Sequence, residues 1–223
     1  MFSGFNNSAS LGHYYKPPPP PVFTSFAFDI IGTHYTGSAS NYPITVNPAN
    51  TTDTYCSITN FNKTNAQNKT FTIYVKGKFD SLTSYSRMFG FGNNVNNFLL
   101  VSRYNTNLLQ LSYGYKNNGS SSYSLNTSNI LPNGTDYFHT FMRFNADTSK
   151  CSAYFYSYTG ALIHNSLECA YTPSNQFANF TRFTLAQDPF TLTNYSVTIG
   201  LAGTYDSYLS TSNMSQIVNQ SLN

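Results

Sequence analysis

A nine-residue alternating segment constrains the fold more than any other part of this sequence. In FTIYVKGKF, spanning residues 71–79, apolar residues alternate with polar or amphipathic ones: Phe71, Ile73, Val75 and Phe79 against Thr72, Tyr74, Lys76 and Lys78. Successive side chains of a strand point to opposite faces of a sheet. The segment therefore predicts a β-strand with one buried face.

Strand-like runs of this kind recur along the chain from Phe23 onward. They are NFLLVSRY, LLQLSYGY, YFHTFMRF, CSAYFYSY, ALIHNSL, TRFTLAQ and YSVTIGLAG, and turn-rich segments such as GNNVNN, YNTN, KNNGSSS, LPNGTD, NADTSK and YTG separate them. Helical periodicity is limited to TSNMSQIVNQ near the C-terminus, where Ser212 or Asn213 can cap a short helix. Frequent short strands with turns between them predict an all-β antiparallel sandwich or barrel.

Charge and hydropathy exclude several classes of partner. Charged residues make up 9% of the chain, against roughly 25% in an average domain. The net charge is +3, and the basic residues form no run, so we expect no nucleic-acid binding. No apolar stretch approaches the roughly 18 residues of a membrane span, so we expect no membrane insertion. The N-terminal segment lacks the basic and apolar regions of a secretory signal.

Residues 1–22 are predicted to form an N-terminal arm. Five consecutive prolines favour a polyproline II rod about 15 Å long, which cannot join a sheet centrally because proline has no amide donor. The residues expected to dock this arm on a partner are Phe2, Phe5, Tyr14, Tyr15, Pro17, Pro18, Pro19, Pro20 and Pro21. The alternative is a disordered tail, as is usual for such termini.

One hairpin brings two cysteines into register. A turn centred on Gly160 in an antiparallel hairpin pairs Cys151 with Cys169, close enough for a disulfide. The alternatives are a register that differs by one residue, or thiols that stay reduced.

Catalytic and metal-binding patterns are weak in this sequence. Glu168 is the single glutamate, and the seven aspartates are isolated, so the paired carboxylates of a glycosidase are missing. No Gly-x-Ser-x-Gly motif is present. We therefore predict a non-enzymatic protein with no catalytic residues, no cofactor and no metal site. The segments NADTSK (145–150) and NGTD (133–136) have oxygens suited to calcium, but both are equally good turn sequences.

Tyrosines on alternate positions are the candidate contact residues. Tyr154, Tyr156 and Tyr158 share one face of a predicted strand, and Tyr113 and Tyr115 share a face of another. Tyrosine rings stack on sugars and are enriched at protein interfaces. The interpretation is contact with a glycan or a protein partner; the alternative is ordinary packing between two layers.

The order of these segments, from about residue 50 to residue 223, resembles the laminin-G-like branch of the concanavalin A-like jelly rolls. The positions that carry the resemblance are Arg87, Phe89, Gly92, Tyr137, His139, Tyr154, Gly160, Tyr205 and Leu209. The resemblance implies a two-sheet jelly-roll sandwich over residues 23–223, with His139 inside it as a strand histidine. In this sequence Tyr137 and Phe138 replace the tryptophan that is usual before the histidine.

Two functions follow from these expectations. The composition and the arm resemble minor capsid or surface-spike proteins of large DNA viruses. The main hypothesis is therefore a structural or attachment protein of the virion, whose arm docks on other subunits of a larger assembly. The alternative is a lectin-like glycan-binding module used in recognition or adhesion, for example at a cell surface.

Overall fold

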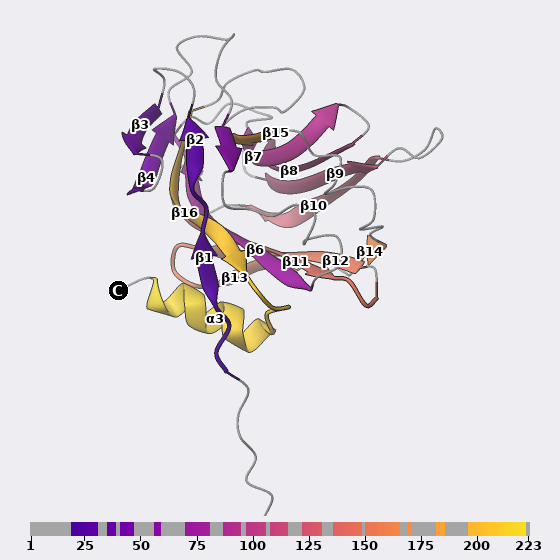
Figure 1. Ribbon diagram of the computed structural model, residues 1–223. Coiled ribbons are helices and arrows are strands. Elements are labelled where there is room, and N and C mark those ends of the chain that lie inside the picture. Colours follow the sequence, from indigo (N-terminus) through magenta and orange to yellow (C-terminus); the bar gives the residue numbers. More distant parts are fainter. Residues whose placement is uncertain are drawn as a thin grey trace, which may run out of the picture.

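Two antiparallel sheets stacked face to face form the body of the protein, as seen in a computed structural model (Figure 1). The structure describes residues 19–30, 35–38, 41–46, 56–58, 70–80, 87–94, 97–105, 108–115, 122–130, 136–148, 150–165, 169–170, 182–185 and 196–221. The predicted all-β, two-sheet antiparallel sandwich is confirmed.

The first sheet, called sheet A, has seven strands along its main path. In spatial order they are β13 (Leu162–Asn165), β12 (Lys150–Ser157), β11 (Phe138–Asn145), β6 (Phe71–Phe79), β16 (Val197–Tyr205), β4 (Asn41–Val46) and β3 (Tyr35–Ser38). Two short strands lie beside this path: β1 (Phe23–Ser25) pairs with β16, and β14 (Cys169–Ala170) pairs with β12.

The second sheet, called sheet B, lies over one face of sheet A. Its order is β10 (Ser122–Ile130), β9 (Leu108–Tyr115), β8 (Asn97–Asn105), β7 (Arg87–Asn94), β15 (Arg182–Leu185), β5 (Cys56–Ile58) and β2 (Phe28–Ile30). Each of the predicted strand runs coincides with a strand of one sheet or the other. β10 was not predicted, because its sequence SYSLNTSNI has the serine and asparagine content of a loop.

The alternating residues of β6 and their neighbours fill the space between the sheets. Ile73, Val75 and Phe79 are fully buried, and Phe79 stacks on Phe138 of β11 with ring centroids 5.7 Å apart. Met88 of β7 approaches from sheet B so closely that a side chain at Gly77 of β6 would collide with its sulfur. This contact shows which face of sheet A is the inner one.

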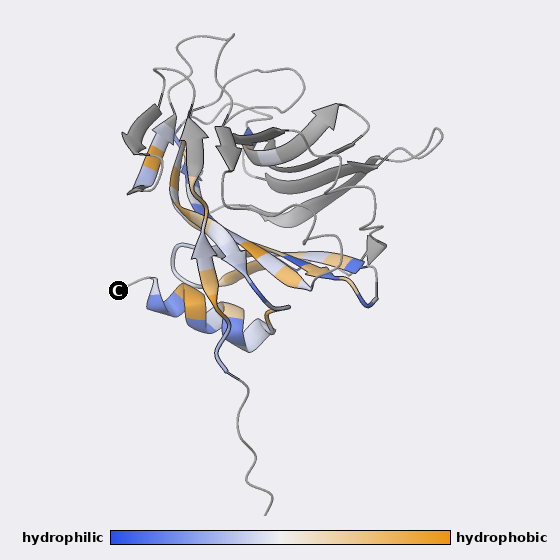
Figure 2. Ribbon diagram, viewed as in Figure 1, coloured by the Kyte–Doolittle hydropathy of each residue, from blue (hydrophilic) through white to orange (hydrophobic). Residues whose placement is uncertain are grey.

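The outer face of sheet A is also buried over much of its length. Helix α3 (Thr211–Gln220) packs against it on the side away from sheet B (Figure 1). Tyr74 of β6 packs in the core that this helix covers and is 1% exposed. Thr72 is 0% exposed, and its Oγ1 donates to the Ser207 carbonyl in the segment just before α3. The prediction of one buried face for residues 71–79 is therefore wrong, because a helix covers the second face. Figure 2 shows hydrophobic and hydrophilic residues side by side on α3, as expected for a helix with one buried face.

Both ends of α3 are held by hydrogen bonds. Ser210 is the N-cap, and its Oγ accepts from the backbone N–H of Asn213 at 3.1 Å, so the predicted caps Ser212 and Asn213 are wrong by two or three residues. The helix has no basic residue in its last turn. Lys76 of β6 fills this role from the sheet, since its Nζ donates to the Ser221 carbonyl at 2.9 Å.

The chain enters sheet A at β1, one residue after the proline run. Val22 N–H donates to Asp206 Oδ1 at 2.9 Å, and Asp206 N–H donates to the Val22 carbonyl at 3.2 Å. Next to this pair, β1 runs so close to Gly203 of β16 that a Cβ there would meet the Thr24 carbonyl and the Phe23 ring. The N-terminal strand is thus fixed along the edge of β16.

Candidate functional site

Strand register arranges the outer face of sheet A into parallel rows of side chains. Residues directly opposite one another in an antiparallel pair point to the same side. Lys78 is opposite Thr198, and Thr198 is opposite Thr45, so these three form one row across β6, β16 and β4. Tyr137 extends the row, because it directly precedes Phe138, the partner of Gly77. We call Thr45, Thr198, Lys78 and Tyr137 the exposed row, because they lie outside the core that α3 covers. Thr198 itself is 6% exposed, and the other three are half-buried.

The other rows lie beneath α3 and form a second hydrophobic core. Its buried members are Tyr74, Phe141, Tyr154, Tyr156, Tyr205, Leu209, Met214 and Val218. The rings pack at aromatic distances, for example Tyr74 and Phe141 at 4.8 Å between centroids. The helix therefore divides the outer face into a covered part and the exposed row beyond its C-terminal end.

Two of the predicted contact tyrosines belong to this second core. Tyr154 is 9% exposed and Tyr156 is 2% exposed. A ring covered by a helix cannot stack on a sugar, so an open contact surface at these two positions is wrong, and the packing alternative applies to them. Tyr158 differs, because it lies in the turn after β12 and is 45% exposed. Tyr113 and Tyr115 lie on β9, and their side chains are outside the described part of the structure.

Arg143 connects the covered part of the outer face to the segment before α3 by hydrogen bonds. Its guanidinium is 7% exposed and donates to Ser152 Oγ, the Leu209 carbonyl and Tyr154 Oη, each at 3.0 Å. It also lies over two tyrosine rings, Tyr154 at 4.3 Å and Tyr208 at 4.2 Å. This buried charge is stabilised by carbonyl and hydroxyl acceptors and by aromatic faces.

His139 lies between the covered part and the exposed row. It is fully buried, as the resemblance implied, and its Nδ1 is 2.8 Å from Tyr74 Oη. Burial, together with the nearby charge of Lys76, lowers the pKa of His139 to about 4. The imidazole is therefore neutral at physiological pH, and Lys76 carries the positive charge at this point of the sheet.

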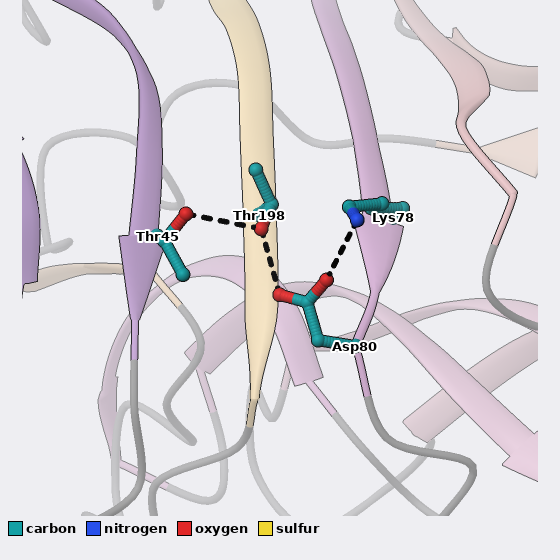
Figure 3. Close-up of polar contacts among 4 residues, drawn as sticks. All are labelled: Thr45, Lys78, Asp80 and Thr198. Atoms are coloured by element: carbon teal, nitrogen blue, oxygen red, sulfur yellow. Dashed lines mark hydrogen bonds and ion pairs between the residues drawn. The ribbon is translucent and has the colours of Figure 1, made fainter.

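A chain of polar contacts runs along the exposed row (Figure 3). Asp80 Oδ2 accepts from Thr198 Oγ1 at 2.7 Å, and Asp80 Oδ1 is 3.1 Å from Lys78 Nζ. Thr198 has one hydroxyl proton and gives it to Asp80, so the Thr45 hydroxyl, 3.2 Å away, donates to Thr198. A backbone hydrogen bond from Asp80 N–H to the Ser196 carbonyl, at 3.0 Å, fixes the carboxylate in place.

Tyr137 lies at the other end of the row, next to two ammonium groups. Lys76 Nζ is 5.8 Å from its ring centroid, and Lys78 Nζ is 5.6 Å from it. The ring packs on Gly200, where a Cβ would be 3.1 Å from Tyr137 Cε1. The register between β16 and β6 shifts at this glycine, so the ring lies over an irregular position of β16 that has no side chain.

The exposed row was not predicted as a site. Its one sequence signal was the pair Lys76 and Lys78 on alternate positions of a strand, which was interpreted as a polar face. Tyr137 entered through the resemblance alone. Thr45 and Thr198 carry no signal, because their proximity depends on pairing across more than 150 residues.

The arm is described in part. Pro20 and Pro21, with Phe23 and Tyr205, line a groove of about 320 Å³ against α3, and its other side consists of Asn213, Gln216, Ile217 and Gln220. Pro19 is exposed. The predicted docking residues Phe2, Phe5, Tyr14, Tyr15, Pro17 and Pro18 lie outside the described residues, so docking through the arm stays a prediction.

The cysteine hairpin has the predicted register, with Cys151 opposite Cys169. Gly160 in the intervening turn has a φ of 82°, a conformation that glycine adopts without strain. Cys151 is buried and is not bonded to another cysteine in the structure. The disulfide with Cys169 stays a prediction.

Metal binding finds no support in the described part of the chain, where no three His, Cys, Asp or Glu side chains come together. Asn145 Oδ1 accepts from the N–H groups of Asp147 and Thr148, which supports the turn interpretation of NADTSK. Most of NGTD lies outside the described residues. Among the described helices, none has the length and hydropathy that a membrane crossing requires.

Comparison with known proteins gives the class of fold. No protein-family model and no curated protein matches the chain. Among solved structures, the CBM40 domain of the Ruminococcus gnavus IT-sialidase bound to α2,3 sialyllactose has a TM-score of 0.55 at 15% identity, covering 70% of this chain and 85% of that one. The leech intramolecular trans-sialidase has a TM-score of 0.54 at 17% identity, covering 69% and 24%.

A second kind of neighbour is a toxin domain. The binding domain of botulinum neurotoxin DC, in complex with rat synaptotagmin II, has a TM-score of 0.62 at 13% identity, covering 89% of this chain and 47% of that one. These likenesses show an antiparallel β-sandwich fold. They give no support to the laminin-G-like branch or to a virion protein.

Proposed function

We propose that this chain is a non-catalytic glycan-binding module and that the exposed row is its sugar-contact surface. The observation that carries the proposal is the row itself. It has a half-buried tyrosine ring on a glycine bulge, with a carboxylate, an ammonium group and two hydroxyls held along the same face. Sugars are recognised by aromatic stacking combined with a few fixed polar groups.

The solved neighbours favour this reading over the virion hypothesis. Two of the three neighbours are binding domains, one bound to sialyllactose and one in complex with synaptotagmin II, and these two support the lectin-like alternative and a non-enzymatic role. A glycan is accordingly the proposed partner, while docking on the subunits of a larger assembly has no comparable support.

A glycan array with the purified chain tests the proposal. We expect reproducible binding to a defined set of glycans. Tyr137→Ala should weaken it by about tenfold or more, since the loss of one stacked ring is worth about 1.4 kcal/mol. Tyr137→Phe, which keeps the ring, is the matched control and should retain most of the affinity.

Thermal unfolding of each variant checks that the fold is intact, because Tyr137 also covers Gly200. An array with no reproducible binding would refute the glycan-binding function. Binding that Tyr137→Ala leaves unchanged, in a folded protein, would show that the sugar contacts another surface.

A further inference from the structure

We propose that the ligand of the exposed row carries a carboxylate, as a terminal acidic sugar does, and that Lys76 and Lys78 bind this group beside Tyr137. The inference rests on the proposed glycan-binding function and specifies its class of ligand. It follows from how the charges around the row are paired.

The two lysines present their ammonium groups to one place. They are two residues apart on β6, so their side chains leave the sheet on the same face. Both Nζ atoms lie within 6 Å of the Tyr137 ring centroid, at 5.8 and 5.6 Å. The chain has 11 Lys and Arg residues in 223, so two of them beside one ring are a local concentration of positive charge.

The protein neutralises one of these two charges. Asp80 forms an ion pair with Lys78 at 3.1 Å. Lys76 donates to the Ser221 carbonyl, which belongs to a helix C-terminus and offers only a partial negative charge. Within the described residues Lys76 forms no ion pair with a carboxylate, and an ammonium group has three donors, so donors are left for a ligand.

The nearby ionisable groups leave the patch positive. His139, in the register position opposite Lys76, is buried and contributes no charge at neutral pH. Asp136 directly precedes Tyr137 but forms no ion pair with either lysine, and its Oδ2 is buried without a hydrogen-bond partner in the described structure. Asp136 is opposite Phe79 by register, on the inner side of sheet A. On the outer face, two positive charges and the negative charge of Asp80 therefore leave one positive charge beside the Tyr137 ring.

A carboxylate on the ligand fits this arrangement better than a neutral sugar does. It would complete the pairing of Lys76 by a charge-assisted hydrogen bond and reduce the repulsion between the two ammonium groups. The sugar ring that carries the carboxylate would then lie next to Tyr137, with the half-buried Thr45 hydroxyl farther along the row. Because the lysine side chains are partly exposed, the attraction should weaken as salt increases.

Calorimetric titration of the full chain with 3′-sialyllactose and with lactose tests the inference. The two sugars differ by the terminal acidic residue. We expect 3′-sialyllactose to bind at least tenfold more tightly at 50 mM salt, and this advantage to shrink at 500 mM salt. The double variant Lys76→Gln, Lys78→Gln should lose the preference, whereas Lys150→Gln, on the exposed start of β12, should keep it.

The outcomes separate this inference from the proposed function. Equal affinity for the two sugars, abolished by Tyr137→Ala, would overturn the acidic-ligand inference and leave glycan binding at the row standing. An acid preference that survives in the folded double variant would also overturn it, since another group would then hold the carboxylate. If neither of these sugars nor any glycan on the array binds, both proposals fail together.

Discussion

Acidification should destabilise the protein through one buried histidine. His139 is fully buried, and its pKa is lowered from 6.5 to about 4 by burial and by the charge of Lys76. In the unfolded chain the imidazole has its ordinary pKa. Between pH 6.5 and 4 the unfolded state therefore binds a proton that the folded state does not, and the free energy of unfolding falls as the pH falls.

The size of this effect follows from the two pKa values. A tenfold difference in proton affinity corresponds to about 1.4 kcal/mol, so the full change amounts to about 3 kcal/mol. It is absent above pH 6.5, develops between pH 6.5 and 4, and is constant below that range. Such a loss is a large fraction of the total stability of an ordinary domain.

Urea unfolding at a series of pH values, followed by circular dichroism, measures this effect. The variant His139→Gln cannot gain the proton, and it should have a weaker pH dependence than the wild type, by about 3 kcal/mol between pH 7.5 and 4. His164→Gln is the matched control, because burial lowers the pKa of His164 less strongly. Identical pH profiles for the wild type and His139→Gln would refute the reasoning, since the carboxylates titrate in both.

Three further predictions concern the elements that fix the outer face, each measured as the free energy of unfolding in urea. Arg143→Met removes the hydrogen bonds to Ser152, Leu209 and Tyr154 and should lower the free energy of unfolding by about 2–4 kcal/mol. A decrease below about 1 kcal/mol would show that these hydrogen bonds do not stabilise the outer face. Gly203→Ala places a methyl group against the Thr24 carbonyl and the Phe23 ring, so β1 must shift. We expect the free energy of unfolding to fall by about 1–3 kcal/mol and proteolysis near residue 23 to become faster. A variant as stable and as resistant to protease as the wild type would argue against this close packing. Ser210→Ala removes the N-cap and should lower the free energy of unfolding by about 1 kcal/mol. Ser212→Ala should change it by no more than about 0.5 kcal/mol. A larger effect at Ser212 than at Ser210 would show that the cap is assigned to the wrong serine.

Local patterns were enough to predict the fold class and most of the long strands, but not β10. Alternation over residues 71–79 and the glycine turn at residue 160 specify local geometry, so the sequence around them is sufficient. The position of α3 was not predictable in this way. The burial of Thr72 and Tyr74 depends on α3 and the segment just before it, more than 130 residues later, and their polar atoms made that face look exposed. The buried tyrosines were misinterpreted for the same reason.

The candidate site depends even more on long-range pairing. Thr45, Lys78, Tyr137 and Thr198 come from four separate segments, and strand register alone brings them into one row. Single-residue signals in the sequence therefore pointed to the many tyrosines, while the candidate site lies beyond the C-terminal end of α3, on the part of the outer face outside the second core.

The central claim is that the exposed row is the surface that binds glycan. Mapping of backbone amide shifts by NMR, with 3′-sialyllactose added to the isotope-labelled chain, tests it most directly. We predict that the largest shifts lie at residues 76–80, 136–139 and 196–200, with smaller ones near Thr45. Shifts confined to sheet B, or to the second core beneath α3, would contradict it.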